Sequence, residues 1–156
     1  MQAIIDLNQA KNYQKKVGGL SILERNLCCL VKNNVIKIFI TGGKKDFIKK
    51  IINKRKFEAD ITFVPDFKEA LKKSFMNGYI ISDDAVFNTD FLSYPDKDTS
   101  YKFGSVNIFY LPYSKLKKLK DSTEIDKLDF DNINNEKFHS RITLEDDKKK
   151  AEKVMV

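Results

Sequence analysis

Residues 35–64 have the sequence VIKIFITGGKKDFIKKIINKRKFEADITFV, and this stretch decides the fold class. Its two ends, VIKIFI and DITFV, are β-branched runs of strand length. Between them, after a TGG turn, apolar residues recur at the spacing of one helix face: Phe47, Ile48, Ile51 and Ile52. A strand, a helix and a second strand in this order predict a parallel βαβ unit with a right-handed crossover.

The same alternation extends toward the N-terminus. Residues 3–7 (AIIDL) are an apolar run of strand length, and a second helix follows them. Ser21 and Glu24 fit a capping box at the start of that helix. Its apolar face is formed by Leu23, Leu27, Leu30 and Val31.

Toward the C-terminus the pattern predicts a helix over 66–76 that ends at Gly78 as its C-cap, and then a strand over 79–82. Further elements follow in order: a strand in 104–111, a helix over 113–120, a mobile polar loop over 121–135, a strand in 137–143, and a closing helix over 144–155 capped by Thr143. We therefore expect one domain over 1–156, a three-layer α/β/α sandwich with a mostly parallel central sheet.

Composition excludes some classes of protein. The chain has 156 residues, of which 42% are hydrophobic, enough for a real core. No apolar run approaches the roughly 20 residues of a membrane-spanning helix, and the first residues do not have the pattern of a secretory signal. Cys28 and Cys29 are adjacent, which disfavours a structural disulfide between them. We expect a reduced, cytoplasmic protein without membrane insertion.

The formal net charge of +7 raises the hypothesis of nucleic-acid binding. Only Arg25, Arg55 and Arg141 are arginines, whereas base readout and stacking rely strongly on arginine. The densest basic run, KKDFIKKIINKRK, is an amphipathic helix with its lysines on the outer face. Nucleic acid is therefore disfavoured as a partner.

The segment KKVGGLSILERNL, from Lys15 to Leu27, allows two interpretations. Gly18 and Gly19 could form a loop that cradles a phosphate, or only the joint where a turn meets the helix. The residues alone favour the turn.

Asp83 and Asp84 follow the predicted strand over 79–82. Ligands of open α/β sheets bind beyond the carboxyl ends of the strands, and Mg²⁺ held by substrate phosphates takes one or two carboxylates. The alternative is that this pair only caps a helix starting at Asn88, because Asp is favoured in such turns. His139, the single histidine of the sequence, gives no metal or catalytic signal.

Together these motifs resemble the MobA-like nucleotidyltransferases, the group that includes sugar-phosphate and inositol-phosphate cytidylyltransferases. KKVGGLSILERNL is similar to the second half of that family's K-P-L-x-K-V-G-G-x-P-L-L-E-R segment. DDAVFNTDFL matches, through Asp84 and Phe87, a strand that ends in Asp before a small V-F turn. GSVNIFYLPYSKLKKL and ITLEDDKKKAEKVM are similar to the strand, helix and terminal helix that follow, so the resemblance covers nearly the whole chain in order.

The resemblance implies a nucleotidyltransferase fold of the GT-A type and a nucleotide or phosphorylated small molecule as ligand. The implied nucleotide-binding residues are Lys11, Lys15, Lys16, Gly18 and Gly19. Mg²⁺ is the implied cofactor, held by Asp84 with Asp83 beside it. Some relatives carry this type of domain ahead of a membrane phosphotransferase domain, which makes such a domain or protein a candidate partner.

Two departures from the family bear on activity. The family has a run like L-A-A-G-x-G-x-R after its first strand, whereas this chain has no glycine between Leu7 and Val17. The family's second metal carboxylate aligns with residues 138–140, where Ser140 stands. The resulting expectation is a catalytically weak or inactive domain kept as a binding or regulatory module. The alternatives are an active nucleotidyltransferase with Mg²⁺ at Asp84, and a basic nucleic-acid-binding domain.

Overall fold

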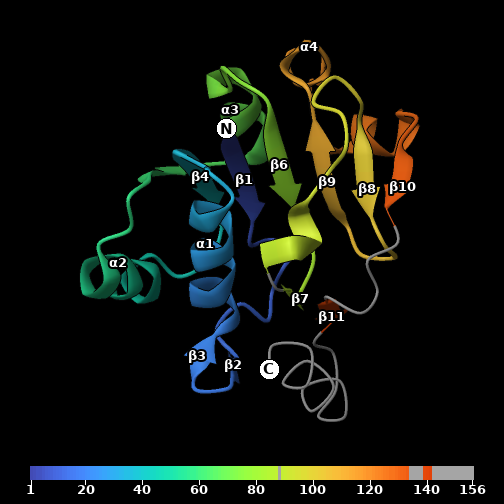
Figure 1. The fold of residues 1–156 in the computed structure, drawn as a ribbon. Helices are drawn as coiled ribbons and strands as arrows, with labels where there is room; N and C mark the ends of the chain where they lie inside the picture. Colours follow the sequence, from blue (N-terminus) through green and yellow to red (C-terminus); the bar gives the residue numbers. More distant parts are fainter. Residues whose placement is uncertain (88, 134–138, 142–156) are drawn as a thin grey trace.

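The computed structural model describes residues 1–87, 89–133 and 139–141. A seven-stranded sheet with the order β10-β8-β9-β6-β1-β4-β5 runs through it (Figure 1). The strands are β1 (Gln2–Asp6), β4 (Lys37–Thr41), β5 (Asp60–Val64), β6 (Gly78–Ile81), β8 (Tyr101–Phe103), β9 (Ile108–Leu111) and β10 (Asp131–Ile133). Neighbouring strands are parallel except where β9 pairs with β6 and with β8. The predicted mostly parallel sheet is confirmed.

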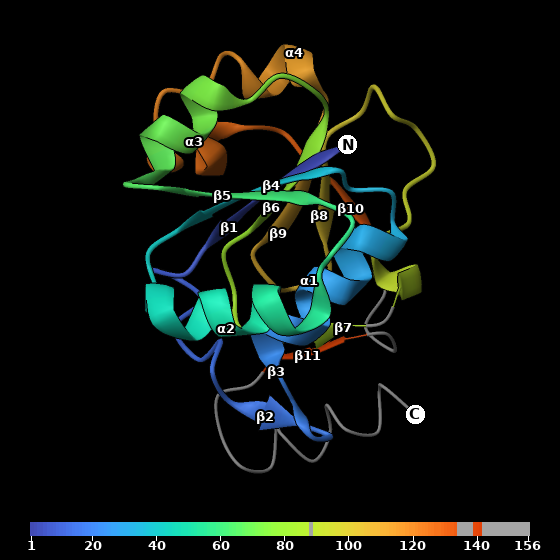
Figure 2. The ribbon, with the colours of Figure 1, turned by 90° about the vertical axis from the view of Figure 1, so that its left-hand side faces the viewer.

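Helices cover both faces of this sheet (Figure 2). On one face lie α1 (Ile22–Lys32) and α2 (Lys45–Arg55), and on the other α3 (Phe67–Lys73) and α4 (Tyr113–Leu116). A 3₁₀ helix, η2 (Ser122–Lys127), packs on the α3 face through Ile125. The predicted three-layer sandwich is therefore confirmed.

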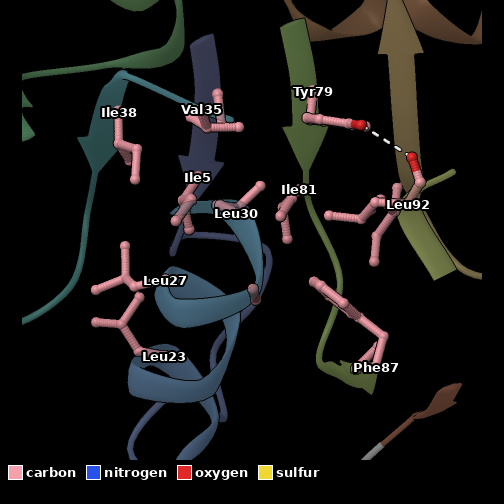
Figure 3. Close-up of a cluster of buried hydrophobic side chains, with 14 of the residues drawn as sticks. Ile5, Leu23, Leu27, Leu30, Val35, Ile38, Tyr79, Ile81, Phe87 and Leu92 are labelled. Carbon is pink, nitrogen blue, oxygen red and sulfur yellow. Dashed lines mark hydrogen bonds between the residues drawn. The ribbon is translucent and has the colours of Figure 1, made fainter. Parts of the chain in front are cut away.

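The interior strand β1 is buried on both faces, which explains the apolar run at residues 3–5. Ile5 belongs to the core beneath α1 and α2, while Ile4 belongs to the core beneath α3 and α4. Figure 3 shows the first of these cores, where side chains of α1 point toward β1, β4 and β6. The labelled members from α1 are Leu23, Leu27 and Leu30.

At the start of α1, the hydrogen bond that the predicted capping box assigns to Ser21 is present. The Ser21 hydroxyl accepts a hydrogen bond from the Glu24 amide at 3.1 Å. The Glu24 carboxylate forms an ion pair with Arg55 of α2, at 3.1 Å, and so ties the two helices of this face together.

Several short elements lie beyond the carboxyl ends of the parallel strands (Figure 1). β2 (Lys16–Val17) and β3 (Leu20–Ser21) form a hairpin that leads into α1. β7 (Ala85–Phe87) pairs antiparallel with β11 (His139–Arg141), in agreement with the strand predicted in 137–143. A 3₁₀ helix, η1 (Thr89–Leu92), follows β7 after one residue.

Two predicted element boundaries were wrong. α3 ends at Lys73, and Gly78 is the first residue of β6 instead of a helix C-cap. A Cβ on Gly78 would lie 2.6 Å from the carbonyl oxygen of Gln2, so the glycine permits close contact between β6 and β1.

The segment predicted as a mobile loop, 121–135, contains η2 and the edge strand β10 within its described part. β8 was not predicted, because its three residues lack a clear apolar pattern. The predicted closing helix over 144–155 and its cap Thr143 lie outside the described residues. No helix in the described ranges is long and apolar enough to cross a membrane.

Candidate functional site

Asp84 lies between β6 and β7, immediately before Ala85, and its carboxylate contacts the segment that follows β1. Its Oδ1 accepts a hydrogen bond from the Asn12 amide at 2.8 Å, and its Oδ2 accepts one from the Asn12 side-chain amide at 2.9 Å. Burial raises the pKa of Asp84, while these two hydrogen bonds and the charge of Lys15 act in the opposite direction. Asp84 therefore lies beside the segment 11–19, joined to it through Asn12.

The Asp83 carboxylate accepts hydrogen bonds from two backbone amides around the end of β6. Its Oδ1 accepts a hydrogen bond from the Asp84 amide, and its Oδ2 accepts one from the Asn107 amide, each at 2.9 Å. Asn107 immediately precedes β9. The carboxylate thus fixes the start of β9 against the end of β6, as short Asp side chains do in turns.

The segment between β1 and β2 occupies the place where the family resemblance implies a phosphate loop. Six of its backbone amides donate to acceptors within the protein: those of residues 7, 8, 9, 10, 12 and 15. Their acceptors are the carbonyls of Thr41, Asp6 and Asn12 and the carboxylates of Asp6 and Asp84. A phosphate cradle needs several amides that point together at the ligand, and these six are committed elsewhere.

Tyr13 fixes the same segment to the helical layer. Its ring is buried and packs edge-on against Phe47 of α2, with centroids 5.9 Å apart. Its hydroxyl accepts a hydrogen bond from the Lys44 amide at 2.7 Å, just before α2 begins. This side chain anchors the loop through packing and a hydrogen bond, a role that glycines could not take.

Gly18 and Gly19 form the turn of the β2–β3 hairpin. Their φ angles, 59° and 87°, are both positive, as a two-residue hairpin turn of type I′ requires. Arg25 of α1 donates from Nε to the Val17 carbonyl at 2.5 Å and from Nη2 to the Gly18 carbonyl at 2.8 Å. The geometry agrees with the turn interpretation of KKVGG.

The predicted cationic residues lie on the surface around this hairpin. Lys11, Lys15 and Lys16 are exposed, as are the two glycines at the tip. The charge of Lys15 is close enough to Asp84 to lower the pKa of that carboxyl. A phosphate bound here would meet mobile point charges in place of ordered backbone amides.

Asp6 is a candidate residue that the sequence reasoning missed. It ends β1, is 5% exposed, and accepts a hydrogen bond from the Asn8 amide at 3.0 Å. Burial raises its pKa, against the effect of the hydrogen bonds from residues 8 and 9. Asp6 lines a pocket of about 220 Å³ together with Ser82, which follows β6, and with residues of β9 and η2. An acidic residue inside an otherwise apolar strand was the available signal.

The donor atoms around Asp84 do not fit a resident metal ion well. Both oxygens of Asp84 and both oxygens of Asp83 already accept hydrogen bonds. Across the described ranges, no group of three or more His, Cys, Asp or Glu side chains is placed to hold a metal. These side chains do not form a metal cage by themselves, and Mg²⁺ carried on substrate phosphates at Asp84 stays a prediction.

Comparison with known proteins gives similarity at the level of the fold. No protein-family model and no curated protein matches the sequence. Among solved structures, HddC from Yersinia pseudotuberculosis has a TM-score of 0.67 at 12% identity, with 99% of each chain covered. The CTP:phosphocholine cytidylyltransferase LicC from Streptococcus pneumoniae has a TM-score of 0.61 at 14% identity, again with 99% of each chain covered.

The inositol-1-phosphate CTP transferase from T. maritima is also similar, with a TM-score of 0.59 at 11% identity over 98% of this chain and 95% of that one. The chain thus has the fold of nucleotidyltransferases over almost its whole length. At these identities the similarity establishes the fold only. The ligand and the activity have to be argued from the residues of the site.

Proposed function

We propose that this chain is a nucleotidyltransferase-like module that binds a nucleotide or a phosphorylated small molecule and has little or no transferase activity of its own. The observation that carries the proposal is the commitment of the loop amides after β1 to protein acceptors. The full-length similarity to nucleotidyltransferase structures supports the ligand class.

Nucleotidyl transfer leaves the protein little covalent work, so its rate depends on positioning and on charge stabilisation. Losing one preorganised donor already costs about a hundredfold to a thousandfold in rate. Here six backbone amides of the segment after β1 donate to acceptors within the protein, and the Asp84 carboxylate accepts hydrogen bonds from Asn12. Lys11, Lys15 and Lys16 attract the ground state and the transition state alike, which gives binding without fast turnover.

A calorimetric titration with each nucleoside triphosphate, with and without Mg²⁺, tests the binding. We expect one of them to bind. We expect the double variant Lys15→Ala, Lys16→Ala to weaken binding roughly tenfold, because it removes two positive charges that would face the phosphates. The matched control is Lys49→Ala, Lys50→Ala on the exposed face of α2, which should bind normally. Failure of all nucleotides to bind would contradict the ligand class.

A pyrophosphate-release assay with CTP, Mg²⁺ and inositol phosphate or sugar phosphates tests the activity. We expect release near the background rate. Turnover of several per second that is lost in Asp84→Asn, with the melting temperature unchanged, would overturn the proposal and establish an enzyme with Asp84 in its site. Asp84→Asn keeps the shape of the side chain and separates loss of charge from loss of folding.

A further inference from the structure

The large hydrophobic side chains that are exposed within the described ranges gather at one edge of the sheet. They are Ile36, Phe75 and Tyr113, with exposed fractions of 55%, 51% and 37%. Ile36 directly precedes β4, Phe75 lies shortly before β6, and Tyr113 begins α4 after β9. Because β9 runs antiparallel to β6, its end lies beside the start of β6. We call these three residues the amino-edge patch, because they lie where β4 and β6 begin.

Hydrogen bonds join the segments that carry Phe75 and Tyr113. The Phe75 amide donates to the side-chain oxygen of Gln2 at 2.9 Å, and the Tyr113 amide donates to the side-chain oxygen of Asn77 at 2.7 Å. The Gln2 amide in turn donates to the Asn77 carbonyl at 3.1 Å. These bonds fix Phe75 and Tyr113 on one continuous surface, with the half-buried Met76 beside them.

The Ile36 end of the patch is tied to the same surface. The Ile36 amide donates to the Met1 carbonyl at 2.8 Å, and Met1 immediately precedes β1, which pairs with both β4 and β6. Exposed apolar side chains that are scattered singly need no explanation, whereas a group of them marks an interaction surface. The partner of that surface can be inferred from the charges around it.

The charge around the amino-edge patch is positive. The segments 32–37, 72–77 and 112–118, which carry its three residues, contain seven lysines and no Asp or Glu. Ion pairs join Lys37 to Asp60 at 2.6 Å and Lys72 to Glu69 at 3.8 Å. The lysines next to Phe75 and Tyr113 are exposed: Lys72, Lys73, Lys115, Lys117 and Lys118. The Nζ atom of Lys117 lies 5.8 Å from the centroid of the Tyr113 ring.

These charges favour an anionic lipid surface over a second copy of the chain. A two-fold contact through the patch would bring the same lysines against each other, and like charges in an interface cost affinity. Three exposed apolar side chains also fall short of the roughly 800 Å² per partner of a stable interface. An anionic lipid surface complements the lysines, and aromatic side chains insert readily among its headgroups. The stems of the lysines can cover apolar surface while their charges face the phosphates.

We infer that the amino-edge patch docks the protein on an anionic lipid surface, with Phe75 and Tyr113 among the headgroups and the lysines against their phosphates. The docking is peripheral. Figure 1 shows α3, α4 and the N-terminus at one end of the molecule and the β2–β3 hairpin at the other. The candidate site at the hairpin therefore faces away from the lipid. The inference does not depend on nucleotide binding there.

The test is co-sedimentation of the full chain with two kinds of lipid vesicle. One is pure phosphatidylcholine, and the other contains equal parts of phosphatidylcholine and phosphatidylglycerol. We expect binding to the anionic vesicles to be at least about tenfold stronger, because several lysines lie near the headgroups. That binding should weaken as salt is added. Equal binding to both vesicles, or binding to neither, would overturn the inference.

Variants locate the contact. Phe75→Ser should weaken vesicle binding by about tenfold, because an exposed side chain that would enter the lipid is removed. The double variant Lys117→Glu, Lys118→Glu should weaken it at least about tenfold. The matched control Lys49→Glu, Lys50→Glu makes the same change in net charge on the exposed face of α2 and should have a much smaller effect. Equal losses in the two double variants would show a response to net charge alone and would overturn the inference.

Two further measurements separate the other occupants of the patch. Sedimentation velocity without lipid should give a monomer, and a dimer that Phe75→Ser dissociates would assign the patch to a second copy instead. Duplex DNA should not compete with the vesicles. Binding of DNA that Phe75→Ser leaves unchanged, together with full vesicle binding by that variant, would mark a general site for polyanions and overturn the lipid assignment.

Discussion

Asp6 and Asp84 both follow apolar runs of parallel strands, and burial raises the pKa of both carboxyls. Asp84 accepts two hydrogen bonds from Asn12 that offset this effect, and the Asp6 carboxylate accepts one from the Asn8 amide in its own turn. The sequence indicated Asp84 because it follows a strand and lies in a matched motif. It did not indicate Asp6, since the run AIIDL was interpreted only as a strand.

We predict that Asp6→Asn stabilises the folded protein at neutral pH. Because the folded-state pKa of Asp6 is raised above its ordinary value of 3.8, the native state binds this proton more tightly than the unfolded chain does. That contribution to stability is present at low pH and is lost as the pH rises through the folded pKa. The ionised side chain is thus a penalty at pH 7 that asparagine removes.

Urea unfolding at several pH values from 7 down toward 4 checks this prediction. The advantage of Asp6→Asn over the wild type should be largest at neutral pH and shrink as the pH falls. The exposed Asp129→Asn serves as control and should show no such trend. Destabilisation by Asp6→Asn at neutral pH would mean that the charge has a stabilising partner, contrary to the burial of this side chain.

Among the elements, those set by local sequence were predicted best. α1, α2, β4 and β5 follow from periodicity and capping, signals that reside in neighbouring residues. β8 and β10 were missed because each has three residues and is defined by pairing at the edge of the sheet. The pocket beside Asp6 was beyond sequence reasoning for a similar reason, because Ser82, Phe109 and Asp126 meet only in the folded chain.

Gly19 is required by its backbone conformation and Gly78 by a close contact, so we predict that alanine destabilises the protein by different amounts at the two positions. Gly19 has a φ of 87° but open space around its missing Cβ, so Gly19→Ala should destabilise the protein by roughly 1 kcal/mol through backbone strain. A Cβ at Gly78 would meet the Gln2 carbonyl at 2.6 Å, so Gly78→Ala should destabilise it by roughly 3 kcal/mol.

Chemical unfolding of the two glycine variants measures this difference directly. Near-equal losses would mean that β1 and β6 can separate slightly to admit a methyl group. That outcome would contradict a rigid central sheet.

At the scale of the whole molecule, two apolar cores lie on opposite faces of one sheet. Leu27 belongs to the core beneath α1 and α2, and Leu116 belongs to the core beneath α3 and α4. Each is fully buried, so each change to alanine should cost about 2–5 kcal/mol of unfolding free energy.

We predict that the losses from Leu27→Ala and Leu116→Ala add within about 0.5 kcal/mol in the double variant, because the side chains share no neighbours across the sheet. Both single variants should also lower the same cooperative transition when fluorescence and circular dichroism are compared. Two separated transitions would indicate that the layers unfold independently and would contradict the expected single domain over 1–156.

The position of β1 between β4 and β6 has a consequence for the order in which the chain can assemble. β1 is made before both of its neighbours and can pair with β4 first, because its other partner, β6, is made only with residues 78–81. At about 5–20 residues per second, a few seconds pass between β4 and β6. During that interval one edge of β1, a strand that is buried on both faces in the folded protein, has no neighbour and is open to pairing with another chain.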